Sequence, residues 1–249
     1  MTKPTNSNPT FYEAIADHYD ELFPLAAAKA AFCRQYLAEP PQRILDIGCA
    51  TGSLCFDLAG DGHRITGLDA DERMIRLAKK KGTGANAIEF ICGDMRELNR
   101  HIPPGSVNGA FCFGNTMAHL DGTPETAQFL AQVRDILKPG GVLLGQLVNY
   151  EKILTHNITT LPLIDRDHAV FKRSYTVEGD RRSILFTGEL TLKADGRTLG
   201  SSVKLQALTM GNLKELLPAA GFKEIKFYGD FNRAPYTTNA GALVFSARA

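Results

Sequence analysis

The sequence lacks the features of a membrane-spanning or nucleic-acid-binding protein. No apolar run reaches the roughly 18 residues that a membrane-spanning helix requires. The 28 Lys and Arg residues are balanced by 27 Asp and Glu residues, so we expect no basic surface for nucleic acid. The chain has 249 residues, of which 44% are hydrophobic, and this is enough for one sizeable core.

A disulfide framework and a secretory signal are also absent. The cysteines are odd in number and form no C-x-x-C pair: Cys33, Cys49, Cys55, Cys92 and Cys112. We expect buried, reduced thiols, and the one candidate for a reactive thiol, Cys49, has no base beside it in the sequence. Residues 1–10 are polar, with no apolar stretch after their lysine. These features predict a cytoplasmic protein.

The dinucleotide-binding motif G-x-G-x-x-G is missing too, although residues 44–57 (ILDIGCATGSLCFD) have the pattern of a buried strand, a glycine turn and a helix start. Gly48 permits a tight bend, and Gly52 permits close approach of a ligand to the backbone. Asp46 precedes the glycines, whereas a nicotinamide-dependent oxidoreductase has its acidic residue about 20 positions after them. We therefore expect a different nucleotide-like ligand.

A regular alternation of strands and helices surrounds this turn. The predicted strands are 43–47, 64–68, 87–92, 107–113 and 141–148, and the predicted helices between them are 53–59, 71–81 and 124–137. Residues 138–141 (KPGG) predict a sharp helix-to-strand turn. The alternation predicts right-handed βαβ units in a mainly parallel sheet. Two earlier helices, 11–23 and 26–37, are expected to cap the carboxyl edge of that sheet.

The alternation stops after Tyr150. Three apolar and β-branched runs, at 168–178, 182–193 and 197–209, are separated by turn signals and predict a three-stranded antiparallel insert. A helix at 211–220 and strands at 222–228 and 242–247 follow. The predicted fold is α/β, a Rossmann-like seven-stranded mostly parallel sheet with an N-terminal helical cap and an antiparallel β lid insert. Residues 1–150 and 210–249 would form the main domain, with the cap in 1–40, and residues 151–209 the lid.

Three carboxylates follow three successive strands: Asp46, Asp69 and Asp94. At such a strand end Asp69 can accept hydrogen bonds from both hydroxyls of a ribose. Asp94 can accept from an adenine amino group, with Met95 against the ring. A ligand with a ribose, an adenine and no phosphate fits this set, and S-adenosylmethionine is such a ligand. The alternative is a turn or helix N-cap role, since Asp69 and Asp71 both stand at the start of helix 71–81.

The segments ILDIGCATG, GLDAD, GDM and LKPGG, in this order and spacing, resemble the class I S-adenosylmethionine-dependent methyltransferases. The resemblance covers about residues 40–150 and the C-terminal part, and it departs where that family usually has glycine, at Ala50. It implies that Gly48 and Ala50 lie beside the methionine moiety and that Asp46 orients the turn or meets the cofactor's amino group through water. Tyr19, from its place in the predicted cap, is a further candidate, with partial burial as the alternative. The full set of candidate cofactor-binding residues is Tyr19, Asp46, Gly48, Ala50, Asp69, Ala70, Asp94, Met95 and Phe113.

Residues 112–120 (CFGNTMAHL) and 149–154 (NYEKIL) are similar to segments of glycine and sarcosine N-methyltransferases. This resemblance implies that Asn115, His119 and Tyr150 lie near the methyl acceptor as catalytic residues. Those enzymes have an arginine directly before the Asn-Tyr pair, where it grips a carboxylate. Here the residue is Val148, which cannot form such a clamp. Arg166 or Arg173 of the insert are candidates to replace it.

The sequence thus predicts a methyltransferase that uses S-adenosylmethionine and needs no metal. It would act on a small-molecule acceptor, for which an amine is the favoured prediction. His119 would serve as the base, or the amine would lose its proton to water before binding. A packing or capping role for His119, and a turn-closing role for Asn149 and Tyr150, are the alternatives.

Two other functions remain as alternatives. A methyltransferase for RNA or protein is disfavoured by the neutral charge and by the lack of an N/D-P-P-Y/F signature after residues 107–113. A non-catalytic cofactor-binding module is the other, because fold does not fix function. We expect a monomer or a homodimer without nucleic-acid or membrane partners.

Overall fold

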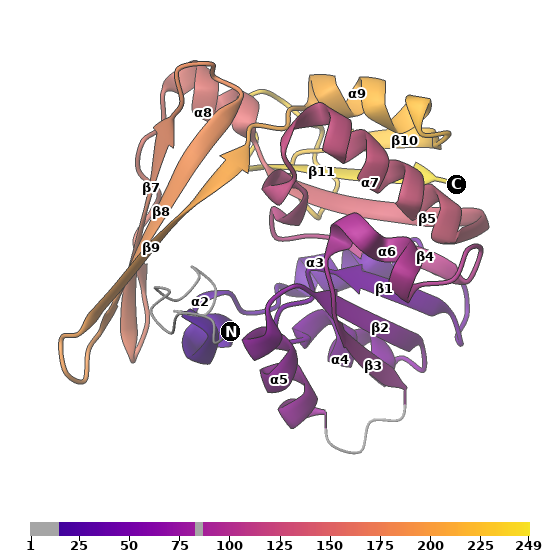
Figure 1. Cartoon of the computed structure of the whole chain (residues 1–249), viewed down its shortest axis with the longest axis horizontal. Helices are drawn as coiled ribbons and strands as arrows, with labels where there is room; N and C mark the ends of the chain where they lie inside the picture. Colours follow the sequence, from indigo (N-terminus) through magenta and orange to yellow (C-terminus); the bar gives the residue numbers. More distant parts are fainter. Residues whose placement is uncertain (1–14, 83–86) are drawn as a thin grey trace, which may run out of the picture.

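The computed structural model describes residues 15–82 and 87–249, so the predicted polar N-terminus and the start of the first predicted helix lie outside the described residues. Its larger sheet has seven strands in the order β10-β11-β5-β4-β1-β2-β3 (Figure 1). The strands are β1 (Arg43–Ile47), β2 (Arg64–Asp69), β3 (Ile88–Cys92), β4 (Val107–Cys112), β5 (Leu137–Val148), β10 (Lys223–Tyr228) and β11 (Ala242–Arg248). All pairs among β1 to β5 are parallel, and β11 runs antiparallel to both of its neighbours. The predicted mostly parallel, seven-stranded sheet is confirmed.

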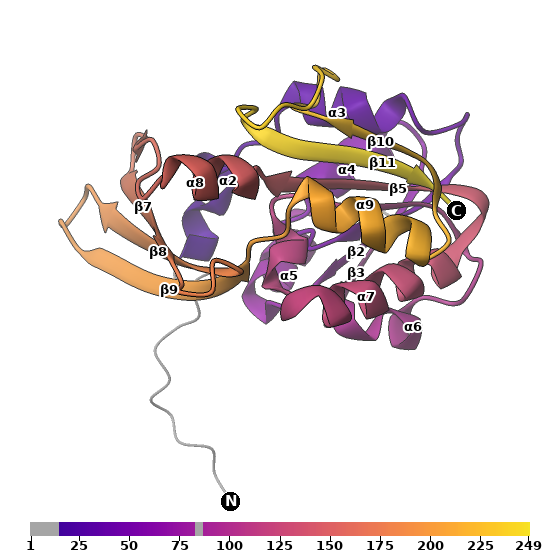
Figure 2. The ribbon, with the colours of Figure 1, turned by 90° about the horizontal axis from the view of Figure 1, so that it is seen from above.

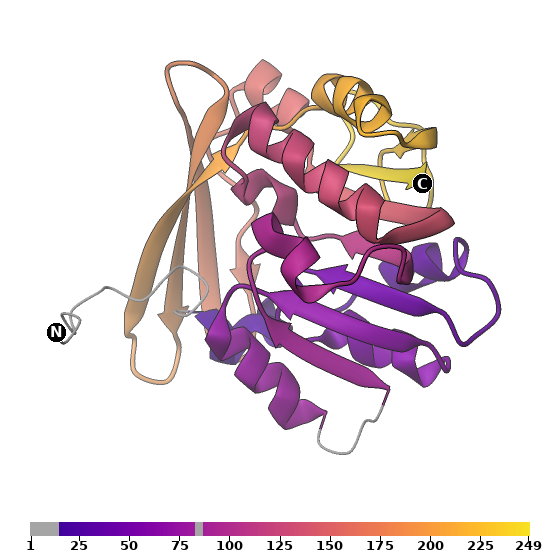
Figure 3. The same ribbon diagram turned by 45° about the vertical axis from the view of Figure 1, so that its right-hand side comes forward.

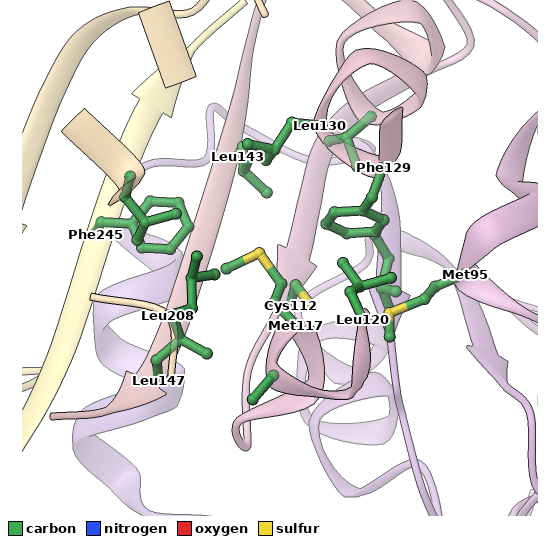
Figure 4. Close-up of a cluster of buried hydrophobic side chains, with 14 of the residues drawn as sticks. Met95, Cys112, Met117, Leu120, Phe129, Leu130, Leu143, Leu147, Leu208 and Phe245 are labelled. Carbon is green, nitrogen blue, oxygen red and sulfur yellow. The ribbon is translucent and has the colours of Figure 1, made fainter. Parts of the chain in front are cut away.

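Helices cover both faces of this sheet, as Figure 2 shows. The helices are α3 (Ala27–Arg34), α4 (Ser53–Gly60), α5 (Glu72–Lys81), α6 (Leu98–His101), α7 (Gly122–Ile136) and α9 (Met210–Ala219). Residues of α3, α4 and α5 pack with β1, β2 and β4 in one buried cluster, and residues of α6, α7 and α9 belong to the larger cluster on the other face (Figure 4). No helix among the described residues is long and apolar enough to cross a membrane.

The N-terminal helices differ from the prediction. Within the described residues the first one is broken into a 3-10 turn, η1 (Ala16–His18), and a single helical turn, α2 (Tyr19–Leu22). The second one, α3, does not lie over the carboxyl edge, because Phe32 and Cys33 are fully buried in the cluster on the face of the sheet. The cap that the structure describes is therefore the short segment of η1 and α2.

The predicted turn at residues 138–141 lies inside β5. Pairing of β4 with β5 shifts from Val107 opposite Leu137 to Gly109 opposite Val142, so three more residues are used on β5 than on β4. Gly140 has a φ of 75°, which only glycine adopts readily, and this bulge absorbs the extra residues. The strand consequently begins earlier than its apolar run indicated.

The insert contains more structure than the sequence predicted. A second sheet, which we call the lid sheet, has four strands in the order β6-β7-β8-β9. They are β6 (Ile164–Asp165), β7 (Ala169–Val177), β8 (Ser183–Leu192) and β9 (Thr198–Gln206), and the helix α8 (Tyr150–His156) precedes them. Neither β6, with two residues, nor α8, with seven, is long enough to give a periodic signal.

The lid sheet stands apart from the larger sheet, facing the edge at which β1, β2 and β4 end (Figures 1 and 3). One end of its inner face packs on the N-terminal cap, where Phe171 and Leu190 contact Ile15 and Leu22. The other end, which includes Tyr175, joins the larger core cluster. The lid sheet is therefore attached to the main domain at both ends.

The start of α8 is fixed by Asn149, which is 1% exposed. Its amide nitrogen donates to the carbonyl oxygens of Thr237, Thr238 and Ala240 at 3.1–3.3 Å. Its side-chain oxygen accepts from the Lys152 backbone at 3.2 Å and from the Tyr236 hydroxyl at 2.8 Å. The turn-closing alternative for Asn149 is the one that the structure describes.

We predict that Asn149→Ala lowers the free energy of unfolding by about 3 kcal/mol, because buried polar partners lose their hydrogen bonds. The matched control is Asn239→Ala in the same loop. Asn239 is exposed, its side chain bonds to His156, and its removal should cost less than about 0.5 kcal/mol. Urea unfolding followed by circular dichroism measures both, and equal losses for the two variants would contradict the assignment.

Candidate active site

The ends of β1 and β2 bring two carboxylates together. One oxygen of Asp69 accepts from the Ala50 backbone at 2.8 Å, and the other accepts from the Asp71 backbone at 2.9 Å. Each oxygen therefore keeps capacity for a further donor. Burial raises the pKa of Asp69, which leaves its ionised form in need of such donors. The N-cap of α5 is Asp71, whose side chain accepts from the Arg73 and Met74 backbones.

Asp46 lies in the interior, 5% exposed. Its pKa is raised from 3.8 to about 6, mainly by burial and further by the charge of Asp69, against the opposing effects of a hydrogen bond from Cys55 and the charge of Lys29. The Cys55 thiol lies 3.4 Å from the carboxylate. Asp46 therefore holds its proton more tightly in the folded than in the unfolded protein.

The glycine turn between β1 and α4 has a left-handed backbone at Gly48, Ala50 and Gly52, with φ values of 74°, 48° and 80°. Alanine in this region costs about 1–2 kcal/mol, which is the price of the departure at Ala50. A side chain at Gly48 would collide with Thr116, and one at Gly52 would collide with Phe90. Close packing within the chain thus explains both glycines, in addition to any ligand.

The N-terminal cap lies on this turn. Tyr19 packs near Ala16, Ala50 and Met74. Burial and the charges of Asp69 and Asp46 raise its pKa, so its hydroxyl stays protonated and can donate. On the same helix, Asp20 accepts from the Thr51 and Ser53 hydroxyls and pairs with Lys81. The structure therefore brings Tyr19 to the predicted cofactor site.

The cysteines agree with the sequence prediction for all but one position. All five are free thiols; four of them are buried, whereas Cys92 is exposed. The pKa of Cys49 is raised, since burial and the charge of Asp46 outweigh its hydrogen bond with Cys55. A thiol with a raised pKa is a poor nucleophile, so the structure gives no support to a reactive Cys49.

The remaining predicted cofactor residues are placed less directly. Asp94 caps the 3-10 turn η2 (Met95–Glu97) by accepting from the Arg96 backbone at 2.9 Å, and its carboxylate also pairs with the Arg96 side chain. Met95 packs in the larger core cluster (Figure 4). The Phe113 ring packs on the rings of Phe111 and Phe231, and Ala70 is exposed at the end of β2. Their contacts with a cofactor stay predictions.

Asn115 and Tyr150, two of the predicted catalytic residues, contact each other. The Asn115 amide nitrogen donates to the Tyr150 hydroxyl at 2.8 Å, and its side-chain oxygen accepts from the Val148 backbone at 3.1 Å. Tyr150 is fully buried. These bonds join the loop after β4 to the end of β5, so both residues have a positioning role that does not require an acceptor.

His119 ends the 3-10 helix η3 (Thr116–His119) and lines a cleft of about 860 Å³. The cleft lies between the start of α7 and the ends of β8 and β9 nearest the main domain, with Arg182 and Lys204 among its polar side chains. Burial, and secondarily the charge of Arg96, lowers the pKa of His119 to about 4. The imidazole is therefore neutral at pH 7, and it is a weak base.

Sequence reasoning missed Asp20, Thr116 and Arg96. Thr116 fills the space above Gly48, and Arg96 donates to the His119 carbonyl at 2.8 Å while it pairs with Glu125. Arg96 directly follows the GDM segment, which was a usable signal. Nothing in the sequence marks Asp20 or Thr116, because their partners are distant along the chain.

Comparison with known proteins finds methyltransferases. Residues 44–141 match a family model described as "Methyltransferase domain". Two relatives carry the name "Putative methyltransferase". One, from Geobacillus sp., is 33% identical over 53% of this chain and 56% of its own length. The other, YqeM from Bacillus subtilis, is 25% identical over 95% of this chain and 96% of its own length. A glycine/sarcosine N-methyltransferase from Halorhodospira halochloris is 26% identical over 89% of this chain and 82% of its own length.

Solved structures share the whole fold. The CcbJ methyltransferase from Streptomyces caelestis has a TM-score of 0.82 at 22% identity and covers 98% of this chain and 99% of its own. CalS10, an amino pentose methyltransferase from Micromonospora echinaspora solved with S-adenosylmethionine bound, has a TM-score of 0.66 at 20% identity over 99% and 100%. At these identities the likeness shows the fold.

The matched family, the relatives, the fold and the strand-end motifs together define an enzyme class. These findings support a class I S-adenosylmethionine-dependent methyltransferase with S-adenosylmethionine as its cofactor. The residues present fit this molecule: two partly satisfied carboxylates, Asp46 and Asp69, offer acceptors to the hydroxyl and ammonium donors of the cofactor. Their negative charge also suits a sulfonium cation.

We predict that Asp46→Asn changes how stability depends on pH. Because the pKa of Asp46 is raised to about 6 in the folded state, the folded protein binds more protons than the unfolded protein between about pH 4 and 6. Above that window the wild type has lost about 3 kcal/mol of folding stability, because Asp46 must ionise in the interior. The Asn variant lacks this titration. Its stability relative to the wild type should therefore rise by about 3 kcal/mol between pH 4 and 7, as measured by urea unfolding at each pH.

The control for this experiment is Asp135→Asn, which removes the same charge from an exposed position. Its stability relative to the wild type should stay nearly constant over the same pH range. If the stability of Asp46→Asn relative to the wild type also stayed constant with pH, Asp46 would ionise without cost, and the burial argument would be contradicted.

Proposed function

We propose that this methyltransferase transfers its methyl group to the nitrogen of a small-molecule amine. The observation that carries the proposal is the attachment of the lid sheet at both ends. Phe171 packs on the cap at one end, and Tyr175 packs in the main core at the other. A sheet held in this way across the carboxyl edge leaves room for a small acceptor and obstructs a polymer. The alternative of an RNA or protein substrate has no support.

The weak basicity of His119 favours an amine over a hydroxyl acceptor. An alcohol must lose its proton during methyl transfer and needs a base of suitable pKa. A histidine with a pKa of about 4 is a poor base at neutral pH. An amine can lose its proton to water before it binds, which is the second of the two routes open from the sequence. Neutral His119 can then accept a hydrogen bond from the N–H of the amine.

Names of similar proteins support the same acceptor class. One relative is named for glycine and sarcosine, and the structure of CalS10 is described as that of an amino pentose methyltransferase. Both printed substrates are small amines. Each name describes another protein, so an amine acceptor for this chain is a proposal.

The chain's own residues position and desolvate the reactants. When bound, S-adenosylmethionine supplies the electrophilic methyl group of its sulfonium for an in-line displacement. Asp69 and the turn around Gly48 orient the cofactor, and the lid sheet excludes water from the acceptor. Asn115 holds the loop after β4 in place through Tyr150 and Val148. The rate then depends mainly on alignment of the amine lone pair with the methyl carbon.

We predict that Asp69→Asn weakens binding of S-adenosylhomocysteine about 100-fold, because the ribose hydroxyls lose a charged acceptor. Isothermal titration calorimetry gives the affinity. The charge-matched control, Asp135→Asn, is exposed and should bind like the wild type. Unchanged affinity for Asp69→Asn would contradict the ribose assignment while leaving the acceptor proposal open to its own test.

The acceptor is tested with S-adenosylmethionine carrying an isotopically labelled methyl group. Glycine, sarcosine and an amino pentose are compared with their hydroxyl analogues, and products are identified by mass spectrometry. We expect N-methylation of at least one amine and no O-methylation. Methylation of a hydroxyl analogue, or of added RNA or protein in place of every amine, would contradict the proposal.

A further inference from the structure

Three central rows of side chains cross the inner face of the lid sheet, between the apolar rows Ala169–Leu192 and Val177–Ile184–Leu205. Residues that lie opposite each other in antiparallel strands point to the same face, so the pairing register assigns the rows. The rows are Phe171–Leu190–Leu199, Arg173–Gly188–Ser201 and Tyr175–Phe186–Val203. The two outer rows are apolar, and the middle row holds a cation, a glycine and a serine.

The apolar rows are covered and the middle row lies between the two contacts. The first row packs on the N-terminal cap, where Phe23 meets Phe171 edge to face at 6.0 Å. Members of the third row belong to the larger core cluster or pack against it. The middle row therefore spans the part of the lid sheet that lies between these attachments and faces the carboxyl edge of the larger sheet.

Arg173 is incompletely satisfied in this position. Its Nε is buried and, within the described part of the chain, has no hydrogen-bond partner. One terminal nitrogen donates to the Pro162 carbonyl at 2.9 Å, and the guanidinium lies 6.0 Å from the centre of the Phe171 ring. No carboxylate of the described residues forms an ion pair with it. Its neighbour across the sheet is Gly188, which places no side chain beside it.

A half-buried guanidinium without a counter-charge among the described residues is unfavourable, and burial lowers the pKa of Arg173. Natural proteins rarely leave such a donor unpaired, so an orphaned Nε on a face turned toward a binding site indicates a ligand. Arg166, the other candidate from the sequence, differs: it is exposed and donates to the Glu21 and Asp165 carbonyls.

We propose that Arg173 binds a carboxylate on the methyl acceptor, so that the acceptor is an amine that also carries a carboxylate group. This inference rests on the proposed function. A guanidinium presents Nε and a terminal nitrogen as a fork that matches the two oxygens of a carboxylate. A carboxylate has one negative charge, which the single cation of the middle row neutralises. A phosphate dianion would keep an unpaired charge in the same place.

The test compares sarcosine with sarcosinamide, its neutral amide, and with aminomethylphosphonate. Variants are Arg173→Met, which keeps the length without the charge, and Arg173→Lys, which keeps the charge without the fork. The control is Lys172→Met, which removes a cation from the exposed outer face of the same strand, where Lys172 lies 3.9 Å from Glu189. Steady-state kinetics with saturating S-adenosylmethionine gives kcat and KM for each acceptor.

We expect Arg173→Met to lower the preference for sarcosine over sarcosinamide at least about 30-fold, mainly through the KM for sarcosine. Arg173→Lys should fall between it and the wild type, and Lys172→Met should match the wild type. Affinity for S-adenosylhomocysteine should not change in any of them. The stability of Arg173→Met should equal or exceed that of the wild type, because a half-buried charge with an unpaired Nε is removed; a purely structural arginine would lower it.

Other outcomes separate this inference from the function on which it rests. If sarcosinamide is methylated as well as sarcosine by the wild type and by Arg173→Met, the amine proposal stands and the carboxylate contact is wrong. Preference for aminomethylphosphonate also overturns the carboxylate. If no amine is methylated while S-adenosylhomocysteine binds, both proposals fail.

Discussion

The hydrogen bonds between the glycine turn and the end of β2 are the constraint on which the site depends. The Ala50 backbone donates to Asp69, and the Gly48 and Cys49 backbones donate to the Leu68 carbonyl at 2.7 and 3.1 Å. These bonds fix the turn in its left-handed course and hold Asp69 near Asp46, whose pKa is raised mainly by burial and further by the charge of Asp69. Under the proposed cofactor binding, donors of S-adenosylmethionine would offset the energetic cost of that arrangement at the oxygens that remain open.

The N-terminal cap connects this turn to the lid sheet. On one side Asp20 bonds to Thr51 and Ser53 of the turn and α4. On the other side the Glu21 side chain accepts from the His168 backbone at 3.1 Å, and Phe23 packs on Phe171. The glycine turn and the lid sheet are therefore linked through one short helix. Displacement of this helix would affect the turn and the lid sheet together.

Much of the fold follows from the sequence because long apolar strands in a βαβ rhythm leave few topologies. The strand-end acids were found for the same reason, since parallel strands present their carboxyl ends at one edge. The sequence could not tell that α3 covers a face of the sheet, because helix amphipathicity does not say which surface it meets. It also could not separate the roles of polar residues after β5. Asn149 and Tyr150 are chemically suited to bind an amine, yet the structure buries both and uses them to join distant loops.

Arg173 is a residue whose role could not be assigned from the sequence. Its sequence neighbourhood does not distinguish it from Arg166, whereas strand register puts it in the middle row of the inner face. The central claim is that this face and the carboxylates of β1 and β2 enclose one ternary site. A crystal structure with S-adenosylhomocysteine and sarcosine tests it most directly. We predict the ribose hydroxyls within hydrogen-bond distance of Asp69 and the sarcosine carboxylate on the Arg173 Nε. A ribose bound away from Asp69, or an acceptor bound outside the lid sheet, would contradict the account.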